Sequence, residues 1–294
     1  MKENKNLLYM LWSVAIIVCV VLSIFALGFS ACARQDDGEK QDAPAKGGFT
    51  VESAAPQTDA PEATPAAQET EVPQTEAPAA MAAPVSVRLG ETPDAGRDYL
   101  DRIIFLGDST TYGIGVYYNY GFTELCPPSQ VWTPASGTLT LSYYNIATIV
   151  YPETKEELTI EEAVARAKPE YMVITLGVNG ISFMDEEWFI RDYTALVELV
   201  KAASPDTKII LNSIYPVAAS YQYQKDINND KIRAANGWIE RIAQDTGVRF
   251  LYSFESLVGP DGYLPETSQN GDGLHLTGEA FTTVMQYIRT HAYV

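Results

Sequence analysis

The chain has 294 residues with 20 basic and 38 acidic side chains, which gives a formal net charge of −18 at neutral pH. A nucleic-acid partner is excluded, because phosphate neutralisation needs a basic footprint that this sequence does not show. The 2 histidines, His275 and His291, and the 3 cysteines have none of the spacings of a metal site, so we expect no metal and no other cofactor.

The chain begins with an apolar segment. Residues 7–33 carry no charge and exceed the roughly 20 residues that cross a bilayer. Lys2 and Lys5 precede them, which predicts a cytoplasmic N-terminus and an exported remainder. Phe29-Ser30-Ala31-Cys32 also resembles a bacterial lipobox, in which the Cys becomes lipidated after cleavage. We therefore expect residues 1–34 to be a membrane anchor or a lipoprotein-type signal, with the rest extracellular at the cell membrane.

A low-complexity segment follows at residues 35–84. It consists largely of Ala, Pro, Glu, Thr and Gln, with Phe49 as its one aromatic residue. Such a segment buries too little apolar surface to offset the entropy lost on ordering. The sequence therefore predicts a disordered linker here, followed by one folded domain over residues 85–294.

Short apolar runs alternate with helical patterns in this domain. Strands are predicted at Arg102–Leu106, Tyr171–Leu176, Lys208–Ile214 and Arg249–Tyr252, with a further strand within Leu139–Val150. Helices are predicted at Thr159–Lys168, Asp185–Ala203, Ile227–Thr246 and Thr277–Thr290. The alternation indicates an α/β fold in which helices cover both faces of a parallel sheet. We interpret the acidic run Glu153–Glu162 as a solvated helix start.

Three short strings lie beyond strand ends or in a polar loop, where ligands bind in such a fold. They are Gly107-Asp108-Ser109, Gly177-Val178-Asn179 and Asp272-Gly273-Leu274-His275. A serine hydroxyl needs a neighbouring base to act as a nucleophile, and a histidine needs a partner to orient its ring. We therefore expect Ser109, His275 and Asp272 to form a catalytic triad for acyl transfer. His291 is expected to be a surface residue.

The three strings resemble three of the four conserved blocks of the SGNH (GDSL-type) hydrolases, over about residues 101–294. The resemblance implies a flavodoxin-like three-layer α/β/α sandwich with a five-stranded parallel sheet. It also implies an oxyanion hole made by the N–H of Ser109 and the side-chain amide of Asn179. Where the family's third block usually has Gly-x-Asn-Asp, this chain has Gly180 in place of the Asp. For the second block's glycine, another oxyanion donor, Gly137 is the nearest candidate.

Aromatic residues crowd the segment between the first and third strings. Two of them, Tyr112 and Tyr117, closely follow Ser109, and Trp132 comes later; we expect all three to line a substrate pocket. A second aromatic loop, Tyr215–Tyr223, follows the Lys208–Ile214 strand and is expected to form another wall, with Tyr215 contacting substrate. Packing of several of these rings in the core is the alternative.

Together these features predict an exported, membrane-tethered serine esterase that removes small acyl groups, in particular acetyl, from an acylated cell-wall or extracellular glycan. Three alternatives stay open: an O-acyltransferase acting on a glycan, a lipase or thioesterase, and a non-catalytic glycan-binding domain on the same fold. The sequence does not indicate an oligomeric state.

Overall fold

The computed structural model describes residues 86–293. The predicted anchor and linker, residues 1–84, lie outside the described residues. Among those described, no helix has the length and apolar character that would let it cross a bilayer.

A five-stranded parallel sheet forms the centre of the domain, with the order β2-β1-β5-β6-β7. The strands are β1 (Ile103–Gly107), β2 (Val131–Trp132), β5 (Tyr171–Thr175), β6 (Lys208–Asn212) and β7 (Arg249–Leu251). Renumbered within the sheet, this order is 2-1-3-4-5, the doubly wound arrangement of flavodoxin-like folds. Four of the predicted strands and the parallel α/β architecture are thus confirmed.

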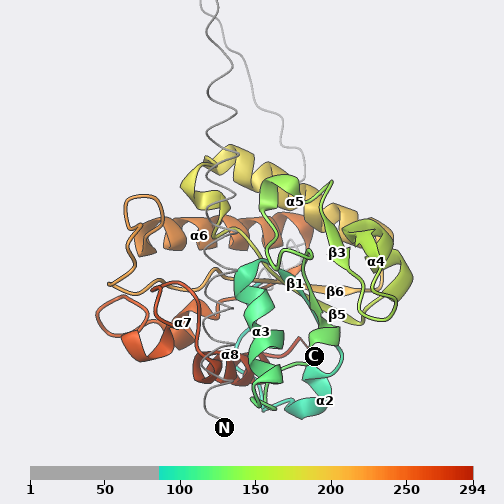
Figure 1. Cartoon of the computed structure of the whole chain (residues 1–294). Helices are drawn as coiled ribbons and strands as arrows, with labels where there is room; N and C mark the ends of the chain where they lie inside the picture. Colours follow the sequence, from blue (N-terminus) through green and yellow to red (C-terminus); the bar gives the residue numbers. More distant parts are fainter. Residues whose placement is uncertain (1–85, 294) are drawn as a thin grey trace, which may run out of the picture. The chain divides into compact units, whose positions relative to one another are not determined.

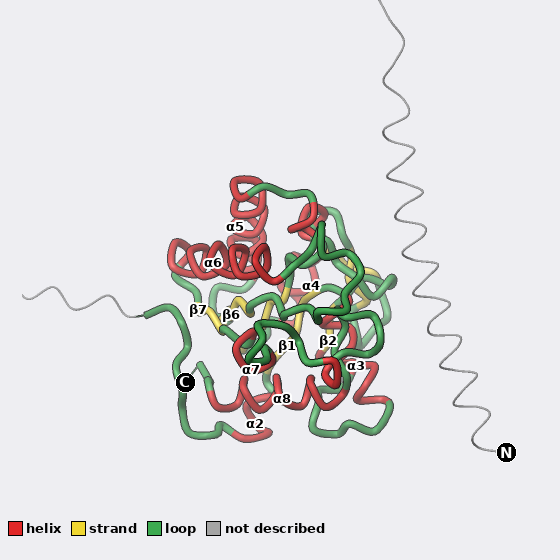
Figure 2. The backbone as a smooth tube through the Cα atoms, turned by 90° about the vertical axis from the view of Figure 1, so that its left-hand side faces the viewer, coloured by secondary structure: helices red, strands yellow, loops and turns green. Residues whose placement is uncertain are grey.

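Helices cover both faces of the sheet (Figures 1 and 2). On one face pack α4 (Ile160–Ala167), α5 (Glu186–Ala203) and α6 (Asn229–Thr246). On the other pack α2 (Gly96–Leu100), α3 (Ser109–Asn119), α7 (Phe254–Leu257) and α8 (Gly278–Thr290). Side chains alternate between these layers along each strand: Phe105 joins the second core and Leu106 the first. The three-layer prediction is confirmed for the described residues.

The four predicted helices are confirmed, and their ends follow from local chemistry. Thr159 and Glu162 form a reciprocal capping box at the start of α4. Asp185 caps α5 by accepting from the N–H of Trp188 at 2.8 Å. At the other end of α6, Gly247 adopts φ +73°, the left-handed conformation that terminates a helix.

The fifth strand was predicted in the wrong place. The run Leu139–Val150 does contain a strand, β3 (Thr148–Val150), but it pairs antiparallel with β4 (Glu157–Thr159) in a separate hairpin. The acidic run Glu153–Glu162 therefore covers the turn and the second strand of this hairpin as well as the start of α4. The fifth strand of the main sheet is β2, whose two residues are too few to show a periodic pattern.

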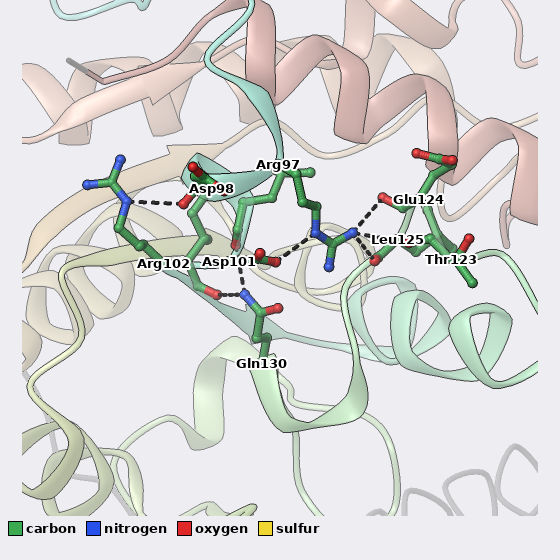
Figure 3. Close-up of polar contacts among 10 residues, drawn as sticks. Arg97, Asp98, Asp101, Arg102, Thr123, Glu124, Leu125 and Gln130 are labelled. Carbon is green, nitrogen blue, oxygen red and sulfur yellow. Dashed lines mark hydrogen bonds and ion pairs between the residues drawn. The ribbon is translucent and has the colours of Figure 1, made fainter.

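A polar network fixes β2 beside β1 (Figure 3). The buried amide of Gln130 donates to the carbonyls of Leu100 and Ile103, both at 2.7 Å. Arg97 of α2 donates through Nη1 to the carbonyls of Thr123, Glu124 and Leu125. These bonds attach the segment before β2 to the start of β1. Long-range hydrogen bonds thus place this strand, which no local pattern reveals.

Four short 3₁₀ helices complete the described elements: η1 (Pro128–Gln130), η2 (Leu141–Tyr143), η3 (Gly180–Ser182) and η4 (Glu266–Ser268).

Candidate active site

Ser109 is the first residue of α3 and follows the carboxyl end of β1. Asp108 caps this helix: its carboxylate accepts from the N–H of Thr110 at 3.0 Å and from the Thr110 hydroxyl at 2.7 Å. A side chain at Gly107 would lie 2.5 Å from the carbonyl oxygen of Thr175, so only glycine allows β1 and β5 to end this close together. Each residue of the first string therefore has a structural reason, and together they present the Ser109 hydroxyl at a helix N-terminus.

The structure brings Ser109, His275 and Asp272 together. His275 Nε2 lies 2.8 Å from Ser109 Oγ, and His275 Nδ1 lies 2.6 Å from Asp272 Oδ2. The other carboxylate oxygen of Asp272 accepts from the N–H groups of Leu274 and His275, at 2.8 and 2.9 Å. The carboxylate therefore holds both the ring and the backbone of its own loop. This is the geometry of nucleophile, base and orienting acid.

The electrostatics of the two site carboxylates differ. Burial acts to raise the pKa of Asp272, but its hydrogen bonds with His275 and the nearby imidazole charge hold that pKa below its ordinary value. Burial raises the pKa of Asp108 to about 6, although the hydrogen bonds from Thr110 oppose the shift. Asp272 thus stays ionised to lower pH, whereas Asp108 changes charge in the mildly acidic range.

The loop that carries the acid and base is braced by the loop after β6. The N–H of Ala218 donates to the carbonyl of Gly273 at 2.8 Å. Gly273 has φ +81°, and a side chain there would lie 2.7 Å from the Cα of Tyr221. Tyr223, the neighbour of Tyr221 in an edge-to-face ring pair, is 44% exposed. The predicted second wall, Tyr215–Tyr223, therefore lies directly beside the triad.

Two buried asparagines of α6 hold the start of that wall. Asn236 accepts from the N–H of Ile214 at 2.7 Å and donates to its carbonyl at 3.0 Å. Asn229 does the same for Val217, at 2.8 and 2.9 Å. Each amide replaces the strand partner that this backbone has lost on leaving the sheet, which keeps the buried polar groups satisfied.

Asn179 lies in the loop after β5, next to β1 in the sheet. Gly177, two residues after β5, has φ +122°, and a side chain there would lie 2.7 Å from the ring of Phe189. The side-chain amide of Asn179 donates to the hydroxyl of Thr138 at 3.3 Å. At the following position, a Cβ on Gly180 would lie 2.8 Å from the sulfur of Met184, so here the methionine occupies the space of the expected Asp.

Gly137 does not supply the third oxyanion donor. Its N–H donates to the carbonyl of Pro134 at 2.8 Å and closes a tight turn in which Gly137 has φ +77°. An N–H committed to a turn is not free to bind an oxyanion, so this prediction is wrong. Thr138, which the sequence analysis did not identify, contacts Asn179 instead. No spacing or motif in the sequence signals it, because the contact joins loops 41 residues apart.

The aromatic residues predicted to contact substrate differ in their exposure. Tyr112, on the first turn of α3, is 49% exposed and is available to a ligand. Tyr117 is half-buried and packs against Phe281. Trp132 is 1% exposed, so its ring belongs to the core and does not line a surface pocket. The expectation that Trp132 contacts substrate is therefore wrong.

Tyr215 is also buried, at 5% exposure, and lines a small cavity beside the site. Its hydroxyl accepts from the amide of Asn212, which also donates to Thr175. The cavity is about 10 Å³ and is lined by Asp108, Thr110, Thr175, Leu176, Val178, Ile214, Tyr215 and Leu274. The lining includes neighbours of Ser109, Asn179 and His275, so the cavity adjoins the triad. Its volume is enough for about one water molecule.

Comparison with known proteins agrees with this geometry. The profile of the GDSL-like Lipase/Acylhydrolase family matches residues 105–281, which include all three strings. The chain belongs to this family. It is accordingly a serine hydrolase that acts on esters. No curated protein matches this acylhydrolase.

Several solved structures are similar to this acylhydrolase. A GDSL-like lipase from Bacteroides thetaiotaomicron is 22% identical, with 66% of this chain and 89% of that chain covered and a TM-score of 0.45. A putative acylhydrolase from Bacteroides fragilis is 22% identical, with 67% of this chain and 88% of that chain covered and a TM-score of 0.46. An acetylxylan esterase from Geobacillus stearothermophilus is 15% identical, with 65% of this chain and 94% of that chain covered and a TM-score of 0.44. Similarity at this level carries no information about the substrate of this chain.

The site contains no cluster of His, Cys, Asp and Glu side chains suited to a metal, within residues 86–293. His291, which we expected to be a surface residue, is half-buried at the C-terminal end of α8: its ring stacks on Tyr287, with ring centres 3.8 Å apart. The chemistry that the arrangement can perform is nucleophilic acyl transfer through Ser109.

Proposed function

We propose that this acylhydrolase is a membrane-tethered extracellular esterase that removes acetyl groups from an acetylated glycan. The observation that carries the chemistry is the continuous chain of hydrogen bonds from Ser109 Oγ through the His275 ring to Asp272, with links of 2.8 and 2.6 Å. The glycan and the tether rest on further features of the chain.

In the proposed mechanism, Ser109 Oγ attacks the ester carbonyl while His275 Nε2 takes the hydroxyl proton. Asp272 keeps Nδ1 protonated and stabilises the imidazolium that forms. The N–H of Ser109 and the amide of Asn179 bind the oxyanion of the tetrahedral intermediate. His275 then protonates the leaving alcohol, and a water molecule activated by the same ring releases acetate from the acyl-enzyme.

The acetyl preference is supported by the size of the cavity beside the triad. A volume of about 10 Å³, enough for about one water molecule, leaves no room for an alkyl chain. Apolar side chains such as Leu176, Val178 and Ile214 line it, which suits the methyl of an acetyl group.

The glycan is supported by exposed aromatic rings on the segments that carry the site. Tyr112 lies one turn after Ser109, Phe183 lies just after Asn179, and Tyr223 lies in the wall beside the triad; they are 49%, 52% and 44% exposed. Exposed flat rings offer apolar faces on which a sugar ring can stack, and the hydroxyls of Tyr112 and Tyr223 stay hydrated. The tether is supported by the apolar residues 7–33 and the Pro-rich spacer, which would let the domain reach a polymer outside the membrane.

The experiment uses the full-length protein in detergent, with Ser109→Ala as the control. Acetate release is measured from an O-acetylated polysaccharide, and turnover is measured on nitrophenyl acetate, butyrate and octanoate. We expect Ser109-dependent acetate release and turnover that falls with chain length. Turnover that increases toward octanoate would overturn the acetyl assignment. Transfer of acetyl to an added glycan acceptor, without free acetate, would indicate an acyltransferase instead.

A further inference from the structure

The loops that follow β2 and β5 are joined by the hydrogen bond between Asn179 Nδ2 and Thr138 Oγ1, 3.3 Å long. Both side chains are half-buried. Since β1 lies between β2 and β5 in the sheet, this bond spans the carboxyl end of β1, where Ser109 follows. The two loops on either side of the nucleophile are thus connected through one hydroxyl group.

The position of Thr138 is fixed independently of Asn179. The preceding turn is closed by the bond from the Gly137 N–H to the Pro134 carbonyl. Gly137 also lies against the ring of Tyr112, so closely that an added Cβ would be 3.2 Å from ring carbons. Tyr112 belongs to α3, the helix that begins at Ser109. The backbone that carries Thr138 is therefore packed against the helix that carries the nucleophile.

A side-chain amide rotates easily about its last torsion, so Asn179 alone does not define a direction for its N–H groups. A bond to Thr138 fixes the plane of the amide and uses one of its two N–H groups. The second N–H is then left for the oxyanion, whose negative charge favours the N–H edge over the carbonyl edge. An oxyanion donor contributes fully only when it is held in place before the charge develops.

We propose that Thr138 is a positioning residue for the oxyanion hole, which acts by orienting the amide of Asn179. The inference rests on the proposed roles of Ser109 and Asn179. This role also explains how the loop after β2 contributes to the site, although the N–H of Gly137 in that loop is used by a turn.

The test compares Thr138→Val, which keeps the shape and removes the hydroxyl, with Thr138→Ser, which keeps the hydroxyl. Loss of a whole oxyanion donor costs about 10²–10³ in kcat, so loss of its orientation is expected to lower kcat about 10–100-fold, with KM nearly unchanged. Thr138→Ser should stay within about threefold of wild type. Thr140→Val is the matched control. Thr140 lies in the same loop and its side chain makes no capping hydrogen bond, so this change should have no effect.

A double-mutant cycle separates positioning from a structural role. If Thr138 acts through Asn179, then Thr138→Val has no further effect on kcat in an Asn179→Ala background. Equal effects of Thr138→Val in both backgrounds, or wild-type kcat in Thr138→Val, would overturn the proposal. So would a loss of activity explained entirely by a lower thermal unfolding midpoint.

A second readout needs no knowledge of the substrate. A fluorophosphonate probe reacts when Ser109 Oγ attacks phosphorus and fluoride leaves, and the phosphoryl oxygen then occupies the oxyanion hole. The labelling rate should fall in Thr138→Val and recover in Thr138→Ser. Labelling and turnover that persist in Ser109→Ala would refute the proposed function itself. A wild type that labels at Ser109 with no difference in Thr138→Val would refute only the role of Thr138.

Discussion

Asp108 is the buried carboxylate whose ionisation should limit stability near neutral pH. It is 1% exposed and caps α3 through two hydrogen bonds from Thr110. Its pKa rises from 3.8 to about 6 on folding, because burial disfavours the charged form. Between these two values the folded protein keeps a proton that the unfolded chain releases. The free energy of unfolding therefore decreases as pH rises through this window.

The magnitude follows from the size of the shift. A difference of about 2 pKa units corresponds to about 3 kcal/mol of stability, which is fully present below the unfolded pKa and lost as pH passes the folded one. Asp108→Asn keeps an oxygen that accepts from Thr110 but carries no charge at any pH. We expect its stability relative to wild type to improve by about 3 kcal/mol between about pH 4 and about pH 7.

Urea unfolding followed by tryptophan fluorescence at several pH values measures this difference. Asp185→Asn is the matched control, since it makes the same change at an N-cap that is exposed. Parallel stability curves for wild type and Asp108→Asn across the window would refute the argument, because a charge buried at that cost must show a pH dependence.

Three further outcomes are expected. Asp272→Asn should lower kcat by roughly 10³–10⁴, measured on nitrophenyl acetate, because an amide N–H facing Nδ1 puts the ring proton of His275 on the nitrogen that must act as base; a loss below tenfold would contradict the orienting role. Gly273→Ala should destabilise the domain by about 2–4 kcal/mol, because the added methyl group would clash with the backbone of Tyr221. Gly262→Ala is the control: Gly262 has a similar φ of +85° but no atoms nearby, so this change should cost less in the same urea assay. Equal losses of stability in the two variants would show that backbone strain alone matters. Turnover should fall steadily from acetate to octanoate esters, and a flat series would show that the cavity beside the triad does not select the acyl group.

The sequence predicts the buried strands of this fold well and its short or interrupted elements poorly. β1 and β5 are apolar runs flanked by polar residues, so the local sequence is enough to predict them. β2 has two residues and depends on the amide of Gln130, a contact between distant parts of the chain. α3 contains Gly113 and Gly115 among aromatic residues, a composition that indicates a loop. Its cap at Asp108 is the one helix signal that the sequence carries.

The triad could be predicted because its residues lie in strings with a family pattern. The contact of Ser109 with His275 confirms this order of strings at a separation of 166 residues. The surroundings could not be predicted in the same way. Both residues of β2 are buried, Val131 in one core and Trp132 in the other, so the burial of Trp132 follows from a strand that the sequence does not reveal. The N–H of Gly137 is used by a turn that only the structure shows.

The proposed mechanism depends above all on Ser109 being the nucleophile of an ester hydrolase. The most direct test is mass spectrometry of the full-length protein after an acid quench during turnover of nitrophenyl acetate, with Ser109→Ala alongside. We expect one added acetyl group on the peptide that contains Ser109, and neither adduct nor turnover in the variant. Turnover that persists in Ser109→Ala, or an acetyl group found only on another residue, would contradict it.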